Sequence, residues 1–194
     1  MTQNISILLI VAFIIVIFVV WFILIKNKSS ESEQMAMILK PYIQDEVKHI
    51  IIPDGIGGLL EIEQLILLEQ GLLLIETYPM SGNLYGGETI DKWTQLTNGR
   101  SYKFANPLRH IRTSRQALMV LAPNIPIFCR VVFNADSVFP KGKPDEVSVL
   151  SSLADDMVNI QSSTVKMNPS SPVWQQIMRV ARKDGQAVQR DGAI

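Results

Sequence analysis

The sequence predicts a mixed α/β or α+β domain that follows one membrane-spanning helix. Three observations lead to this prediction. Residues 5–25 form an apolar run without a charged side chain, short apolar runs of strand length follow, and helical patterns lie before and after those runs. Helices that flank a series of strands are typical of α/β and α+β domains. The remainder of the 194-residue chain is long enough for one domain with its own core.

The N-terminal run is expected to be a membrane anchor. A helix over residues 5–25 rises about 1.5 Å per residue and just crosses a hydrocarbon core of ~30 Å. A secretory signal would begin with a positive charge, which Met1–Asn4 lacks, and would end in a small-residue cleavage site. Lys26 and Lys28 follow the run and favour the cytoplasmic side. We therefore expect contact with the lipid bilayer through residues 5–25 of a cell-membrane protein, with its N-terminus outside and its domain in the cytoplasm.

Hydrophobic periodicity and turn residues give the expected order of elements after the anchor. Asn106 and Pro107 are typical of a helix start, with asparagine as N-cap and proline at the first helical position. The expected elements are a helix at 32–44, strands at 47–53, 60–68 and 72–75, a loop or short hairpin with Gly82, Gly86 and Gly87, a helix at 106–120, a strand at 127–133, and helices at 151–161 and 171–183.

These elements suggest four parts of the chain. We assign residues 1–25 to the anchor, 26–31 to a linker, 32–165 to the domain and 166–194 to a C-terminal helical extension. The sequence gives no functional account of the extension.

Charge is unevenly distributed although the formal net charge is zero. Residues 29–91 hold eleven acids and two lysines, whereas residues 92–135 hold seven basic residues and no acid. The two groups can be solvated faces that form salt bridges with each other. Alternatively, they can be an acidic metal pocket beside a basic stripe that binds phosphate. A uniformly basic nucleic-acid binder is excluded, but a local basic face is not.

Glu63 and Glu76 are the most informative pair of acids. Each lies on an expected strand, and the turn at Glu69–Gly71 joins the two strands. In an antiparallel hairpin centred on that turn, the two carboxylates lie opposite each other or nearly so. Such a pair can share Mg²⁺ or Mn²⁺, since hard cations prefer oxygen ligands. The alternative is that both are surface carboxylates at strand ends, although a carboxylate that closes so apolar a strand is expected to be partly buried and paired.

The helix after Asn106 carries a regular row of positive charge. Arg109, Arg112 and Arg115 recur every three residues. This row can meet a nucleic-acid backbone, anionic lipid head groups, or only solvent.

Other reactive residue types point to no site. Cys129 lies in an apolar strand and is expected to be a buried small hydrophobe, and His49 is expected at the surface. One cysteine and two histidines make a zinc site of the usual kind unlikely to form. The glycines at 55–58 lead into a strand, whereas a phosphate-binding glycine loop opens a helix.

The order of several short motifs resembles the nuclease-related domain (NERD) family over roughly residues 31–160. That family has an acid within an apolar strand, a glycine turn, a second strand that ends in E-x-K, and a later N-P helix start. The matching segments are Glu61–Leu68, Gly71–Tyr78, Ser81–Gly82, Trp93, Asn106–Leu108 and Cys129–Phe133.

This resemblance implies a restriction-endonuclease-like fold of the PD-(D/E)XK type, a mixed sheet flanked by helices, with a metal-dependent site. Carried over by position, Glu63 is the strand acid, Glu76 is the E-x-K acid and Glu33 is the acid of the first helix. The resemblance therefore implies that Glu33, Glu63 and Glu76 hold Mg²⁺ or Mn²⁺. Tyr78 would occupy the catalytic lysine position. If the protein is a nuclease, the row of Arg109, Arg112 and Arg115, together with His110, is expected to contact DNA or RNA.

The sequence departs from the family pattern at important positions. Glu63 replaces an aspartate, Gln64 a histidine and Tyr78 the lysine, and Arg109–His110 stands where a glutamine is expected. Serines replace the glycines before Glu33. A tyrosine is neutral at pH 7, because its ordinary pKa is about 10. The positive charge would have to come from another element, for which the candidates are Lys48, Lys92, Arg109 and His110.

Two functions therefore remain open. The first is metal-dependent phosphodiester hydrolysis of DNA or RNA. The second is a non-catalytic binding or scaffold module that kept the fold and binds a nucleic acid, an unidentified protein partner or the inner membrane surface.

Overall fold

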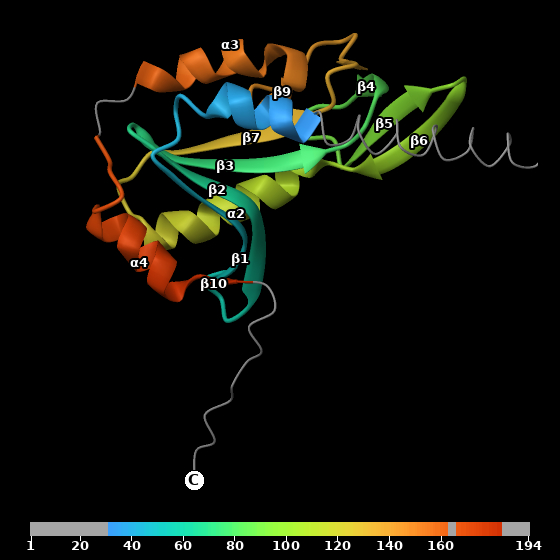
Figure 1. Cartoon of the computed structure of the whole chain (residues 1–194). Coiled ribbons are helices and arrows are strands. Elements are labelled where there is room, and N and C mark those ends of the chain that lie inside the picture. Colours follow the sequence, from blue (N-terminus) through green and yellow to red (C-terminus); the bar gives the residue numbers. More distant parts are fainter. Residues whose placement is uncertain (1–30, 163–165, 184–194) are drawn as a thin grey trace, which may run out of the picture. The chain divides into compact units, whose positions relative to one another are not determined.

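The structure is a computed structural model that describes residues 31–162 and 166–183 (Figure 1). The chain divides into two compact units, residues 1–38 and residues 39–194. Within the described ranges, no helix is long and apolar enough to cross a membrane. The expected anchor at residues 5–25 lies outside the described residues and stays a prediction.

The first described helix is shorter than expected. It covers residues 31–39, and β1 (Asp45–Pro53) begins soon afterwards. The prediction that this helix continues to Gln44 was wrong. Pro41 explains the difference, because proline disfavours helical geometry in the residue before it.

The main sheet contains six strands in the order β10-β1-β2-β3-β7-β9. The chain from β1 to β3 runs antiparallel, whereas β3, β7 and β9 are parallel, so the sheet is mixed as predicted. Its further strands are β2 (Leu59–Leu68), β3 (Gly71–Tyr78), β7 (Ile127–Phe133), β9 (Val147–Val149) and β10 (Arg182–Lys183).

The central strand β3 is buried on both faces, as its apolar run predicted. Residues 71–76 are all buried. Helix α2 (Pro107–Leu121) lies on one side of the sheet and helix α3 (Leu153–Val158) on the other (Figure 1). Asn106 caps α2 and Pro107 begins it, as the sequence indicated. Short 3₁₀ turns at Leu150–Ser152 and Asn159–Ser162 flank α3 without a break, so the expected helix at 151–161 is confirmed as a continuous helical segment that is α-helical only at its centre.

A second, four-stranded sheet occupies a region for which the sequence indicated only a loop or short hairpin. Its order is β6-β5-β4-β8, and β5 and β6 form a hairpin across the turn Asn98–Gly99. Both turn residues have positive φ, which suits a tight two-residue hairpin. The strands are β4 (Gly82–Tyr85), β5 (Lys92–Thr97), β6 (Arg100–Ala105) and β8 (Ser137–Val138).

An aromatic cluster joins the two sheets. The Trp93 ring of β5 is fully buried and stacks on Phe133 of β7, with 6.2 Å between centroids. Phe104 and Phe139 meet the same indole edge-on. The second sheet is thereby fixed to the end of the main sheet where β3 and β7 finish.

The C-terminal segment contributes to the core of the domain. Helix α4 (Pro172–Val180) buries Trp174 and Ile177, and the Trp174 indole donates to Asp45 Oδ2 at 2.8 Å. The expectation of a helix through Lys183 was wrong, because residues 182–183 are extended and pair with β1. The edge of β1 offers backbone partners that a longer helix would leave unused.

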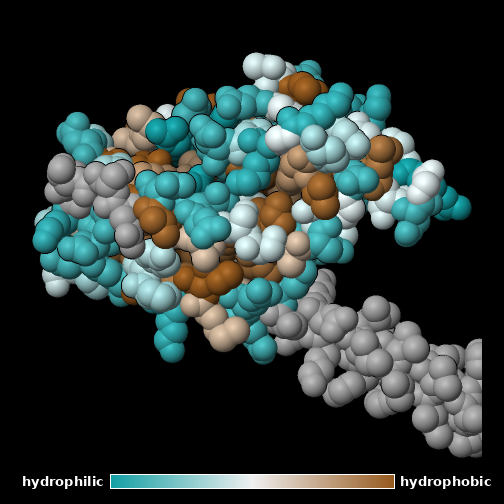
Figure 2. All heavy atoms as spheres, turned by 90° about the horizontal axis from the view of Figure 1, so that it is seen from above, coloured by the Kyte–Doolittle hydropathy of each residue, from teal (hydrophilic) through white to brown (hydrophobic). Residues whose placement is uncertain are grey.

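The surface shown in Figure 2 is mostly hydrophilic, with hydrophobic residues in groups between hydrophilic ones. This distribution is ordinary for a face in contact with water.

We expect Gly86→Ala to destabilise the domain strongly. A Cβ at Gly86 would overlap the indole of Trp93, which is fully buried and cannot move aside. Overpacking of this kind costs about 1–3 kcal/mol of unfolding free energy. Gly87→Ala is the matched control, since its Cβ would meet only the flexible end of Ile90, at 3.3 Å. Denaturant unfolding of both variants tests this, and equal stability of the two would contradict it.

Candidate functional site

Glu63 and Glu76 lie across from each other at the point where β2 and β3 separate. The two strands pair from Leu68 and Gly71 at the turn to Gln64 and Ile75, and the next position in this register places Glu63 against Glu76. The hairpin predicted from the sequence is therefore confirmed, with both acids at its open end.

Glu63 joins the two strands beyond their last backbone pair. Its Oε2 accepts the backbone N–H of Thr77 at 2.9 Å, and its Oε1 accepts the Thr77 hydroxyl at 2.5 Å. On its other side, Glu63 faces a break in the β1 ladder, where His49 has a positive φ of 51°. The Glu63 carboxylate thus links β2 to β3 just beyond the last backbone pair of the two strands. Each oxygen keeps a further lone pair for another partner.

Glu76 is buried and paired with the imidazole of His110. Only 7% of the residue is exposed, and its Oε1 lies 2.6 Å from His110 Nδ1. Burial raises the pKa of the Glu76 carboxyl, and the charge of Glu63 raises it further, while the hydrogen bond and charge of His110 lower it. The partner that the sequence analysis required for a buried carboxylate is therefore supplied by α2.

Tyr78 places an uncharged hydroxyl where the resemblance expects a lysine. Its ring contacts Phe133, with 5.6 Å between centroids. Burial raises the pKa of the Tyr78 phenol, and the nearby charges of Glu76 and Glu63 raise it further. Tyr78 therefore stays neutral near pH 7 and supplies no positive charge.

The structure distinguishes among the four candidates for the displaced positive charge. His110 contacts Glu76, whereas Arg109 pairs with Asp91 and Lys48 lies 4.0 Å from Glu46. Lys92 lies on β5 in the second sheet. His110 is thus the candidate that reaches the carboxylate pair.

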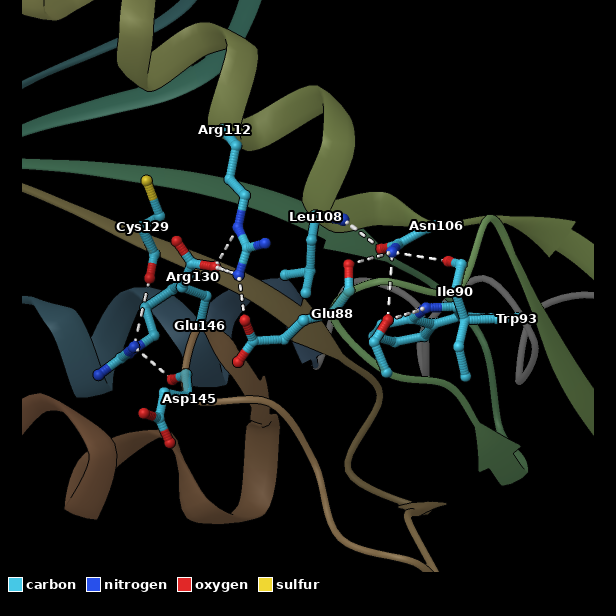
Figure 3. Close-up of polar contacts among 11 residues, drawn as sticks. Glu88, Ile90, Trp93, Asn106, Leu108, Arg112, Cys129, Arg130, Asp145 and Glu146 are labelled. Carbon is cyan, nitrogen blue, oxygen red and sulfur yellow. Dashed lines mark hydrogen bonds and ion pairs between the residues drawn. The ribbon is translucent and has the colours of Figure 1, made fainter.

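Two members of the arginine row on α2 are held by acids. Arg109 forms a salt bridge with Asp91. Arg112 binds Glu146 with 2.6 Å between Nε and Oε2 and also reaches Glu88 at 3.2 Å (Figure 3). Arg115 is exposed and forms no ion pair with the residues that the structure describes. Asp91 and Glu88 of the acidic segment therefore form salt bridges with arginines of the basic segment. This is the first of the two alternatives that the charge distribution left open.

Asn106 fixes the loop that carries these acids. Its side-chain amide donates to the carbonyl oxygens of Gly87, Glu88 and Ile90, at 3.2, 3.2 and 2.9 Å, while its Oδ1 caps α2 at Leu108 (Figure 3). Sequence reasoning found the cap but not the loop contacts, because they join residues that are 16 to 19 positions apart.

Two carboxylates are available for a divalent cation in the domain. Protein sites bind Mg²⁺ through one or two carboxylates together with water and substrate phosphate, so Glu63 and Glu76 suit this ion chemically. No cluster of three or more His, Cys, Asp or Glu side chains arranged for a metal occurs within residues 31–162 and 166–183. Glu33 belongs to the unit of residues 1–38, which is described separately, so its role as a third ligand stays a prediction.

The other reactive side chains lie where the sequence indicated. His49 is exposed and lies 3.7 Å from Glu61. Cys129 is buried, and burial raises the pKa of its thiol to about 12. The thiol is therefore neutral and inaccessible at physiological pH.

Comparison with known proteins gives one match. The family model of the nuclease-related domain (NERD) matches residues 28–134, which is more than half of the chain. No curated protein matches the chain, and no solved structure does.

We expect Asn106→Ala to lower the unfolding free energy by at least about 1 kcal/mol, the typical value of an N-cap alone. The loss should exceed this value because three part-buried hydrogen bonds to carbonyl oxygens also disappear. Gln116→Ala, at an exposed position of the same helix, is the control. Denaturant unfolding compares the two, and similar stabilities would rule out the role given to Asn106.

We expect Cys129 to resist alkylation in the folded protein. Iodoacetamide reacts with thiolate, and a thiol with a pKa of about 12 that is also buried offers almost none at pH 8. Mass spectrometry should detect modification only after denaturation. Rapid modification of the native protein would contradict the burial of this side chain.

Proposed function

The chain belongs to the nuclease-related domain family, and from this membership we propose that it hydrolyses phosphodiester bonds of DNA or RNA with the help of a divalent metal ion. One observation supports the proposal most directly. The buried carboxylate of Glu76 contacts the imidazole of His110 at 2.6 Å, beside the carboxylate of Glu63. A basic group at this position can take over part of the work of the missing lysine.

Glu63 and Glu76 would hold the ion. When bound, Mg²⁺ or Mn²⁺ supplies an activated water and neutralises charge on a phosphate. The protein's own groups have separate tasks. Thr77 fixes the orientation of the Glu63 carboxylate through two hydrogen bonds. Glu76 orients the His110 ring by its contact with Nδ1.

His110 would lie beside the substrate phosphate in place of the lysine. An imidazole can donate a proton to a leaving oxygen. Half of the His110 side chain is exposed, so a substrate can approach it. Tyr78 would contribute only a hydroxyl that donates or accepts a hydrogen bond.

A non-catalytic binding or scaffold role is the second candidate, and a specific observation favours it. Both oxygens of Glu63 already accept hydrogen bonds from Thr77, which is what a purely structural carboxylate does. The neutral Tyr78 at the lysine position also favours a non-catalytic role. In this case the domain would bind a nucleic acid, a protein or the inner membrane surface without cleaving anything.

The location of either activity follows from the N-terminal sequence. We propose that residues 5–25 anchor the domain at the cytoplasmic face of the cell membrane. The support is the uncharged apolar run itself and the lysines that follow it.

A nuclease assay on the full chain in mild detergent decides between the two candidates. We expect cleavage of DNA or RNA with Mg²⁺ or Mn²⁺, no cleavage with chelator, and a loss of about 10²-fold or more in Glu76→Gln and His110→Gln. Glu69→Gln makes the same change as Glu76→Gln at an exposed acid in the turn at the other end of the hairpin, and should cleave normally.

Two controls make the result decisive. Equal cleavage by every variant would identify a contaminant. Thermal unfolding should also show a rise in melting temperature with Mg²⁺, by mass action, that Glu76→Gln lacks. Absence of both cleavage and metal stabilisation would leave the non-catalytic role.

A further inference from the structure

Much of the positive charge of residues 92–135 is not neutralised by the contacts described above. Arg109 and Arg112 pair with acids, and Arg130 donates to the carbonyl oxygens of Cys129 and Asp145 (Figure 3). Lys92 and Lys103, by contrast, are exposed and form no ion pair within the described part of the chain. Both lie on the hairpin of β5 and β6.

The strand register places these two lysines on one face of the second sheet. Lys103 pairs with Thr94, which pairs with Tyr85 on β4, so the three side chains form one row across three strands. Lys92 lies two residues before Thr94 and therefore points to the same side. Lys141 joins them, with its Nζ 6.0 Å from the centre of the Tyr85 ring.

The opposite face of this sheet packs on the aromatic cluster. Trp93 and its partner Phe104 alternate with the lysine positions and turn toward Phe133 and Phe139. The lysine face is consequently the outward one, and Lys92, Lys103 and Lys141 are all exposed on it. We call Tyr85, Lys92, Lys103 and Lys141 the lysine face.

Two acids that lie next to the lysine face in sequence are engaged by α2. Glu88 and Asp91 immediately precede β5, and they pair with Arg112 and Arg109 of α2. These salt bridges hold the two carboxylates to the helix. The lysine face therefore presents three ammonium groups, of which that of Lys141 lies over the Tyr85 ring, and none of the three forms an ion pair with a described residue.

We propose that the lysine face binds the phosphodiester backbone of a single-stranded nucleic acid. The three ammonium groups complement phosphate charge, and an open sheet face with an aromatic side chain suits a single strand, whose bases can stack on the ring. This inference rests on the proposed function, because that function is the reason for choosing a nucleic acid as the ligand.

The position of the lysine face is appropriate for a substrate of the carboxylate pair. Only three residues separate Tyr78 from the start of strand β4, and the contacts of Tyr78 with Phe133 and of Phe133 with Trp93 connect the two regions. A nucleic acid bound to the second sheet would therefore lie on strands that follow β3, the strand of Glu76, directly in the chain.

Fluorescence anisotropy with a labelled single-stranded DNA of about 20 nucleotides tests the proposal, since such a length exceeds one typical binding site. The full chain is used in mild detergent with chelator, so that cleavage does not interfere. We expect Lys92→Glu/Lys103→Glu to weaken binding at least tenfold. The slope of log K against log salt should also fall by about 1.4, or 0.7 for each lost phosphate contact.

Lys40→Glu/Lys166→Glu is the matched control, because it makes the same change in net charge at exposed lysines outside the second sheet. It should retain near-normal affinity, and circular dichroism should show that both double variants are folded. Equal weakening of the two, or no weakening in Lys92→Glu/Lys103→Glu, would overturn the proposal. Binding confined to anionic lipid vesicles, or lost instead in Arg115→Glu, would do so as well.

The two proposals can fail separately. Lysine-dependent binding by a protein that never cleaves would refute hydrolysis and support the lysine face. Metal-dependent cleavage that is unaffected in Lys92→Glu/Lys103→Glu, with unchanged binding, would refute the lysine face and leave hydrolysis standing.

Discussion

Burial of a carboxylate at the end of the central strand is the constraint on which the site depends. Strand β3 is covered on both faces, and its last buried residue is Glu76. A charge at such a position is costly unless a partner compensates it. His110 supplies the partner, and for this purpose α2 must lie against the end of β3. The burial of the Glu76 carboxylate therefore depends on the packing of α2 against β3.

The same helix organises the charge around the site. Asn106 caps α2 and holds the loop before β5, and that loop presents Glu88 and Asp91 to the arginines of the helix. Because these two acids pair with the arginines of α2, they do not form ion pairs with Lys92 and Lys103 of the hairpin. The salt bridges on α2 thus leave the lysine face of the second sheet positively charged.

The altered motif is consistent with a redistribution of roles across the fold. In the family pattern a lysine follows the second acid on the same strand, whereas here that position is Tyr78 and the nearest basic group, His110, comes from α2. The Tyr78 phenol stays neutral beside the two carboxylates, and the contact with Glu76 is made by the imidazole of His110. Thr77 completes the arrangement, since it holds Glu63 where the strands separate.

The sequence by itself determined the elements with strong local signals. The hairpin of Glu63 and Glu76, the strand with Cys129 and the start of α2 at Asn106 all follow from short-range patterns of apolar, turn and capping residues, and the structure confirms them. Their order also carried the family resemblance. What the sequence did not reveal was the second sheet, whose strands are short and partly polar, and the extended pairing of residues 182–183.

Only the tertiary structure decided which charges meet. Sequence offered four candidates for a displaced positive charge and one row of three arginines. The fold brought His110 to Glu76 and used Arg109 and Arg112 in salt bridges. The physical reason is that each of these contacts joins residues 18 to 34 positions apart. Local patterns fix a strand or a helix turn, but the partner of a charge depends on how those elements pack.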